Sequence, residues 1–224
     1  MGAENAFQLG LLQRQLSDKQ FPVHHQTAAK YLPALMEKFR TSSGPLNGPM
    51  ALINSISYTP YFIRFCRLDA SKGLAVIQTK RVAAAIDEIL TMTPNDAGSI
   101  GQFLATILLL QGTGDVDPKD SKILLPKLKL WQRRFSGRLA EDTAFRVEML
   151  LMSRGKTPEM MLPVLAMLAS KLDKCSHPSC DRKERVGGGE LMRCAKCKSA
   201  SYCGSEHQKK HWPQHKALCF AATF

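Results

Sequence analysis

The sequence lacks any apolar stretch approaching the roughly 20 residues that a transmembrane helix needs. Cysteine is nearly absent from its first three quarters, where residues 1–174 hold only Cys66. The start of the chain shows no basic residues followed by an apolar run, as a secretory signal would. A myristoylation signal has Ser or Thr where this chain has Ala6. We therefore expect an intracellular protein, nuclear or cytoplasmic, that does not contact membranes.

Acidic residues are few, with 19 Asp and Glu against 31 Lys and Arg, and the formal net charge is +12. The excess is denser at residues 171–219, which hold eleven basic and five acidic side chains. Such a patch attracts nucleic acid or acidic proteins, although most charged faces simply contact solvent. A nucleic-acid-associated regulator is therefore kept as an alternative function.

Residues 1–174 predict helices separated by Pro/Gly loops, without a convincing strand. Two apolar sets recur at i, i+4, i+7 and i+11, which puts each set on one helix face. They are Ala28, Leu32, Leu35 and Phe39, and Met161, Leu165, Leu168 and Leu172. Further helices are expected over Leu74–Leu90, Ile100–Leu110 and Ala144–Met152, with others opening at Asp117-Pro118 and Thr157-Pro158, and loops over Gly44–Pro49 and Gly112–Asp120.

A Leu-Pro-x-Leu tetrad begins at Leu32, Leu125 and Leu162. The last two lie 37 residues apart, near the period of about 40 to 47 residues in HEAT and armadillo repeats. The region loosely resembles such an α-solenoid, and an irregular helical bundle is the other interpretation. The predicted fold is thus an all-α domain over residues 1–174, a small zinc-stabilised finger over 175–219 and a tail over 220–224.

Six cysteines and two histidines form four close pairs near the C-terminal end. The pairs are Cys175 and Cys180, Cys194 and Cys197, Cys203 and His207, and His215 and Cys219. Eight donors suffice for two structural zinc sites of four ligands each. His207 and His215 are about 12 Å apart along a predicted helix over Ser205–Leu218, so they belong to different sites. Spacing alone leaves sequential and interleaved pairing open, and the lone upstream cysteine disfavours three disulfides.

The segment from Cys175 to Cys219 resembles a MYND-type zinc finger. The resemblance rests on the Cys/His spacing, on Tyr202 before Cys203 and on the run Gln208 to Lys216. It implies interleaved sites. The implied ligands are Cys175, Cys180, Cys203 and His207 for the first zinc ion, and Cys194, Cys197, His215 and Cys219 for the second. The family usually has Cys at position 207 and C-x2-C as its first pair, so replacement by His177 or His211 is an open alternative.

The eight donors leave neither zinc ion a position for water or substrate, and catalytic zinc requires one. No H-E-x-x-H, G-x-S-x-G or complete P-loop occurs either. We therefore expect two structural zinc ions and no enzymatic activity. The resemblance implies a protein-interaction adaptor that binds proline-containing peptides beside Gln208 and Trp212. A SET-type protein methyltransferase, a class in which some members carry this finger, is the less favoured alternative.

Overall fold

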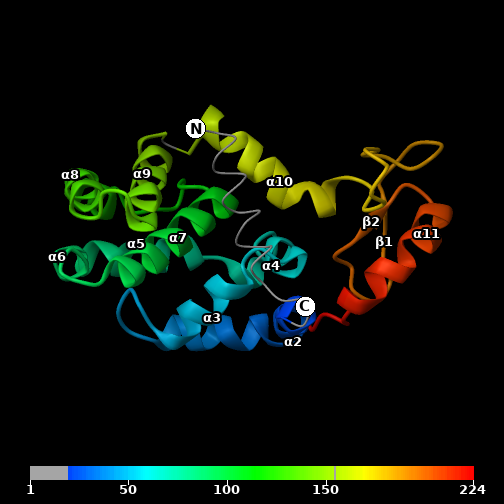
Figure 1. Ribbon diagram of the computed structural model, residues 1–224, viewed down its shortest axis with the longest axis horizontal. Coiled ribbons are helices and arrows are strands. Elements are labelled where there is room, and N and C mark those ends of the chain that lie inside the picture. Colours follow the sequence, from blue (N-terminus) through cyan, green and yellow to red (C-terminus); the bar gives the residue numbers. More distant parts are fainter. Residues whose placement is uncertain (1–19, 154) are drawn as a thin grey trace. The chain divides into compact units, whose positions relative to one another are not determined.

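The computed structural model describes residues 20–153 and 155–224, which are mostly helical with one small sheet (Figure 1). The chain divides into two compact units. We call one the helical unit, made of Ala34–Ser57 and Cys66–Met161. The other is the finger unit, made of the described parts of Met1–Pro33 together with Tyr58–Phe65 and Leu162–Phe224. Among the described helices, none has the length and apolar character that crossing a membrane requires.

The helical unit is built around α7, Pro94–Gln111, whose side chains are buried on nearly every side. Helix α9, Leu139–Met152, packs along α7 and also along α8, Pro118–Arg134, and α5, Leu74–Ala84, packs on both α7 and α8. A Cβ atom added at Gly101 of α7 would lie 2.3 Å from the Thr143 hydroxyl of α9. Only glycine therefore allows this approach of the two helices.

Caps account for where several helices begin. The Asp117 side chain accepts a hydrogen bond from the Lys119 N–H, and Pro118 opens α8, as predicted. Thr93 caps α7 through the Asp96 N–H at 3.2 Å, and Pro94 follows it. The prediction that started this helix at Ile100 missed that pair and was about six residues too short.

Other predictions for the helical unit were wrong in detail, and α9 begins at Leu139, five residues before the expected Ala144. The helix expected over Leu74–Leu90 breaks at Ala85, after which the short α6 covers Ile86–Ile89. The loop expected over Gly44–Pro49 ends early, because the Asn47 side chain caps α3, Gly48–Ile56, through the Met50 N–H. Short 3₁₀ turns cover Asp69–Ser71 and Glu159–Met161.

The longest described helix, α2, spans Gln20–Thr41. Its predicted apolar stripe is buried, since Ala28, Leu32, Leu35 and Phe39 are at most 9% exposed. The tetrad proline Pro33 lies in the interior of α2 and Pro126 in the interior of α8, whereas Pro163 is the second residue of α10, Leu162–Asp173. The tetrads thus occupy different positions in their helices, and the solenoid prediction is not confirmed.

The finger unit combines a zinc-finger-like segment with upstream helices. Strand β1, Met192–Arg193, pairs antiparallel with β2, Ser201–Tyr202, and α11 follows at Ser205–His215 with a 3₁₀ turn over Lys216–Leu218. Helix α10 packs on α4, Pro60–Phe65, and on β2. The finger unit therefore includes α10, which directly precedes the finger, and α4, which lies about 100 residues earlier in the sequence.

The chain after α11 is fixed to α2 by a proline. Pro33 has no N–H, so the Ala29 carbonyl lacks its usual partner within the helix. The backbone N–H of Thr223 donates to that carbonyl at 3.0 Å. The Thr223 hydroxyl lies 3.2 Å from the Lys30 carbonyl oxygen. A helix-interior proline thereby creates an attachment point for the end of the finger unit.

Candidate metal centres

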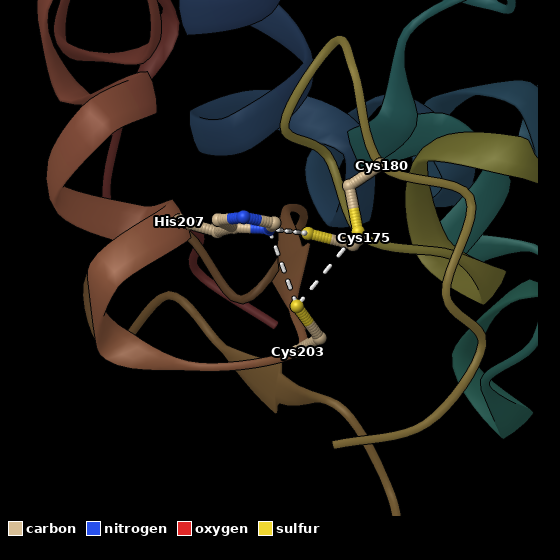
Figure 2. A group of neighbouring side chains, drawn as sticks. All are labelled: Cys175, Cys180, Cys203 and His207. Atoms are coloured by element: carbon tan, nitrogen blue, oxygen red, sulfur yellow. Dashed lines mark hydrogen bonds between the residues drawn. The ribbon is translucent and has the colours of Figure 1, made fainter. Parts of the chain in front are cut away.

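The first candidate centre groups the donor atoms of Cys175, Cys180, Cys203 and His207 (Figure 2). The four side chains point toward one another, and their donor atoms all lie within 4.8 Å. The Cys180 and Cys203 sulfurs are 3.8 Å apart, and His207 Nδ1 lies 3.5 Å and 3.2 Å from the Cys175 and Cys203 sulfurs. The cysteines are buried and the histidine is partly exposed.

The second candidate centre groups Cys194, Cys197, His215 and Cys219, all of them buried. The Cys194 and Cys219 sulfurs are 3.7 Å apart, and the Cys197 sulfur lies 3.6 Å from His215 Nε2. The turn around Cys197 is held by the Lys198 N–H, which donates to the Cys194 carbonyl at 2.8 Å. Lys198 adopts the left-handed backbone, and the Ser199 N–H points to the Cys197 sulfur at 3.4 Å.

The sheet explains why the pairs interleave. Antiparallel pairing of Met192 with Tyr202 brings the chain ahead of Cys194 beside the chain ahead of Cys203. The helix α11 then places His207 in its first turn and His215 at its end. The first and third pairs along the segment thus form one group, and the second and fourth pairs form the other. Of the two pairings that the sequence left open, the structure brings together the interleaved one.

The geometry fits a tetrahedral ion. Ligands placed tetrahedrally at zinc bond lengths of about 2.3 Å for sulfur and about 2.0 Å for nitrogen lie about 3.8 Å and 3.5 Å from one another. The sulfur–sulfur approaches of Cys180 to Cys203 and of Cys194 to Cys219 are 3.8 and 3.7 Å, three sulfur–nitrogen contacts are 3.2 to 3.6 Å, and all donor atoms of a group lie within 4.8 Å of one another. Three thiols and one imidazole also bind zinc in preference to magnesium or calcium, which favour oxygen donors. Both groups therefore can hold a metal ion.

Burial shapes the protonation of these groups. It raises the pKa of the Cys203 thiol to about 11 and that of the Cys219 thiol to about 12, with neighbouring thiols adding to the effect. Burial, together with the nearby charges of His211 and Lys196, lowers the pKa of His215. Neutral imidazole is the form that binds metal, whereas the thiols must lose their protons, so metal binding at these groups releases protons.

The two histidines considered as replacement ligands have other contacts. The His177 ring stacks on the His207 ring at 4.5 Å, and its Nδ1 lies 3.1 Å from the Ser179 hydroxyl. The Nδ1 of His211 lies 3.0 Å from the Tyr202 hydroxyl, and its ring stacks on His215 at 5.8 Å. Neither joins a candidate group among the residues that the structure describes. Both pack against a group member instead.

Gln208 and Trp212 lie one turn apart on α11, so they share one face of the helix. Gln208 is partly exposed, and Trp212 is 45% exposed with its ring 5.9 Å from that of His215. The interior of the finger contains Tyr202, fully buried, instead of this tryptophan. A pocket of about 200 Å³ adjoins His215 and is lined also by His25, Pro60, Tyr61 and Leu218.

Tyr61 is the main residue near the second centre that the sequence did not predict. It lies in α4, is 1% exposed, and its hydroxyl lies 2.9 Å from the carbonyl oxygen of Leu218, the residue before Cys219. Burial raises its pKa, and the Cys197 and Cys219 thiols add to that. Nothing local in the sequence signals a contact across 157 positions.

Comparison with known families assigns the segment that carries both centres. Residues 173–219 match the MYND finger family and form a MYND finger. MYND fingers are typically zinc-binding modules that mediate protein–protein interactions. The armadillo or HEAT resemblance of the upstream helices has no such support.

Several curated proteins are similar over short stretches. Histone-lysine N-methyltransferase SMYD3 of Homo sapiens is 50% identical over 40 residues, which is 18% of this chain and 9% of that protein. Egl nine homolog 1 of Mus musculus is 37% identical over 51 residues, 23% of this chain and 12% of that protein. N-lysine methyltransferase SMYD2-B of Danio rerio is 55% identical over 31 residues, 14% of this chain and 7% of that protein.

The chain thus covers only about a tenth of the length of these relatives. The SMYD proteins match the finger region alone. No solved structure matches the chain.

Proposed function

We propose that this chain is a zinc-dependent adaptor whose finger binds short proline-containing peptides. Two structural zinc ions are held, one by each candidate group. The first ion has Cys175, Cys180, Cys203 and His207 as ligands, and the second has Cys194, Cys197, His215 and Cys219. Support comes from the tetrahedral spacing of the donor atoms and from the donor set itself.

The peptide-binding face is formed by Gln208 and Trp212. The observation that carries this proposal is the 45% exposure of Trp212 on a helix that both metal centres fix in place. A proline ring packs on the face of an indole, and a rigid aromatic anchor is typical of sites that dominate binding energy. The Gln208 amide, one turn earlier, is placed to hydrogen-bond a peptide backbone.

We further propose that the chain has no catalytic activity of its own. Four protein ligands at each centre leave no coordination position for water, which catalytic zinc needs. The similarity to SMYD methyltransferases covers the finger and does not reach the remaining helices. A methyltransferase assay with labelled methyl donor and protein substrates, showing turnover, would refute this part of the proposal.

The test begins with metal analysis of the purified chain, for which we expect two zinc ions. Binding is then measured on an array of short peptides with a central proline. Changing Trp212 to Ala should weaken the binding free energy of the selected peptides by about 2 kcal/mol, which is about a thirtyfold loss of affinity. Tyr31→Ala is the matched control, because Tyr31 is an aromatic residue of α2 in the same unit and is 55% exposed.

The nucleic-acid alternative is tested in the same experiment. Binding to phosphates weakens steeply as salt rises, whereas a peptide on an indole face is much less sensitive. If a DNA or RNA duplex binds at physiological salt and Trp212→Ala leaves that binding unchanged, the adaptor proposal fails in favour of the alternative.

A further inference from the structure

Helix α8 of the helical unit concentrates positive charge. The segments Ala34–Ser57 and Cys66–Met161 contain sixteen Lys and Arg and twelve Asp and Glu. Six of the basic residues but only one acidic residue lie in α8, Pro118–Arg134. Outside this helix, the acidic residues of the unit outnumber the basic ones by one. The basic character of the unit is therefore a property of one helix.

The charge lies beside an exposed apolar stripe. Ile123 and Leu130 are 48% and 43% exposed and stand seven residues apart, with the exposed Pro126 between them. A spacing of seven is two helical turns, about 10.5 Å along one face. The opposite face of α8 is accounted for, because Leu124, Leu128 and Trp131 are buried where α8 packs on α5 and α9.

Cations border this stripe. At 100° per residue, Lys122, Lys129 and Arg133 follow one side of the stripe and Arg134 the other. We call Lys122, Ile123, Pro126, Lys129, Leu130 and Arg133 the α8 face. Within residues 20–153 and 155–224, Lys122 and Arg133 form no ion pair. The Lys129 ammonium forms a long ion pair with Glu148, at 3.8 Å between nitrogen and oxygen. At the edge of the face, Lys127 pairs with Asp87.

We propose that the α8 face binds an acidic amphipathic helix of a partner protein. Carboxylates of such a helix pair with Lys122, Lys129 and Arg133, and its apolar residues cover Ile123 and Leu130. Charge complementarity selects this occupant, since Lys122 and Arg133, which form no ion pair among the described residues, steer and orient an acidic partner. The apolar stripe favours a protein helix over nucleic acid as the occupant, because phosphates have no apolar groups that could cover two exposed aliphatic side chains. The residues of this face belong to the helical unit, whereas the metal centres and Trp212 belong to the finger unit.

The test uses the full chain and a fluorescent designed peptide of about 18 residues, rich in Glu, with Leu at i, i+3 and i+7. A scrambled peptide of identical composition lacks the stripe. Binding is followed by fluorescence anisotropy at low and physiological salt. We expect the patterned peptide to bind at least about tenfold more tightly than the scrambled one, because only its apolar residues align.

Two variants separate the charged and apolar contributions. Each of two double variants should lower the affinity for the patterned peptide about tenfold or more. One is Lys122→Glu with Arg133→Glu, and the other is Ile123→Ser with Leu130→Ser. Lys38→Glu with Lys80→Glu is the matched control, since both lysines are exposed residues of the same unit outside α8 and the change in net charge is identical. This control should alter the affinity less than about twofold. Circular dichroism and thermal melting confirm that each variant is folded.

Four results would overturn the proposal. Equal binding of the patterned and scrambled peptides would mean attraction by charge alone. A different occupant would be identified if a DNA duplex, or vesicles containing anionic phosphatidylserine, displaced the labelled patterned peptide at a lower concentration than the unlabelled patterned peptide does. Self-association abolished by Ile123→Ser with Leu130→Ser would make the face a contact between copies of this chain. An equal loss in the Lys38/Lys80 control would remove any special role of α8.

Discussion

The hydroxyl of Tyr61 lies 2.7 Å from the backbone nitrogen of Phe220 and 3.0 Å from the Phe220 carbonyl oxygen. It therefore accepts the Phe220 N–H and donates its single proton to the carbonyl of Phe220 or of Leu218, which is 2.9 Å away. These two residues flank Cys219, a member of the second candidate centre. Helix α4 thus positions a member of this candidate centre that lies more than 150 positions later in the sequence.

Replacing Tyr61 with Phe should selectively weaken the second centre. The change removes the hydroxyl and leaves the partly buried Phe220 N–H without its acceptor, at a cost of about 1 kcal/mol. With two zinc ions bound, we expect one of them to transfer faster to a chromophoric chelator while the other is unchanged. Tyr58→Phe is the control, because the Tyr58 hydroxyl contacts His24, outside both centres. Uniform acceleration of both ions would contradict the selective role.

Single ligand substitutions should each remove one zinc ion. Cys180→Ser and Cys219→Ser remove a thiolate from the first and second centres, so native mass spectrometry should find one zinc ion instead of two. Cys66→Ser should retain both, since Cys66 belongs to neither group and burial raises the pKa of its thiol. Two zinc ions in either ligand variant would show that the assignment of that ligand is wrong.

Chelation should unfold the finger, residues 175–219, and spare the helical unit. The finger has little apolar interior beyond Tyr202, so bound metal provides much of its folding energy. Hydrogen exchange with and without a zinc chelator should show lost protection in α11 and weaker protection in α4 and α10, which pack within the same unit. Amides of α7 should be unchanged, because α7 packs on α3, α5 and α9 in the other unit. Loss of protection in α7 would contradict this separation.

Helix α7 offers a sharp test of close packing. Gly101→Ala should destabilise the helical unit by about 1 to 3 kcal/mol, because the new Cβ would lie 2.3 Å from the Thr143 hydroxyl and 2.9 Å from its Cβ. Gly98→Ala in the same helix is the control. Its Cβ would have neighbours at 3.5 Å or more, so the better helix propensity of alanine should leave stability equal or higher. Urea unfolding of both variants measures the difference.

The donor pairs of the finger could be predicted because their spacing is local, whereas their interleaving was implied by the family resemblance. The members of each donor pair are close in sequence, three positions apart for Cys194 and Cys197 and four for Cys203 and His207. At such spacings both donor atoms can bind one metal ion. A helix was predicted over Ser205–Leu218, and α11 covers Ser205–His215 with a 3₁₀ turn over the last three residues. The face of Gln208 and Trp212 followed from the family resemblance, and its peptide remains a prediction.

Features that depend on distant partners could not be predicted. Helix α4 was missed because its six residues are nearly all buried and show no helical periodicity. The break at Ala85 follows a run of good helix formers, so no local signal marks it. The role of Pro33 depends on Thr223, 190 positions later. In each case the stabilising contact comes from outside the segment.

The make-up of the finger unit also sets an order of events during protein synthesis. Every residue of the helical unit, up to Met161, leaves the ribosome before Cys175 does, so that unit can fold on the nascent chain. The aromatic residues Tyr61 and Phe65 of α4 instead wait for Leu218, Phe220 and Phe224, which are translated last. A cell short of zinc would then accumulate chains that are folded in one unit and expose aromatic side chains in the other, a state that chaperones and proteases recognise.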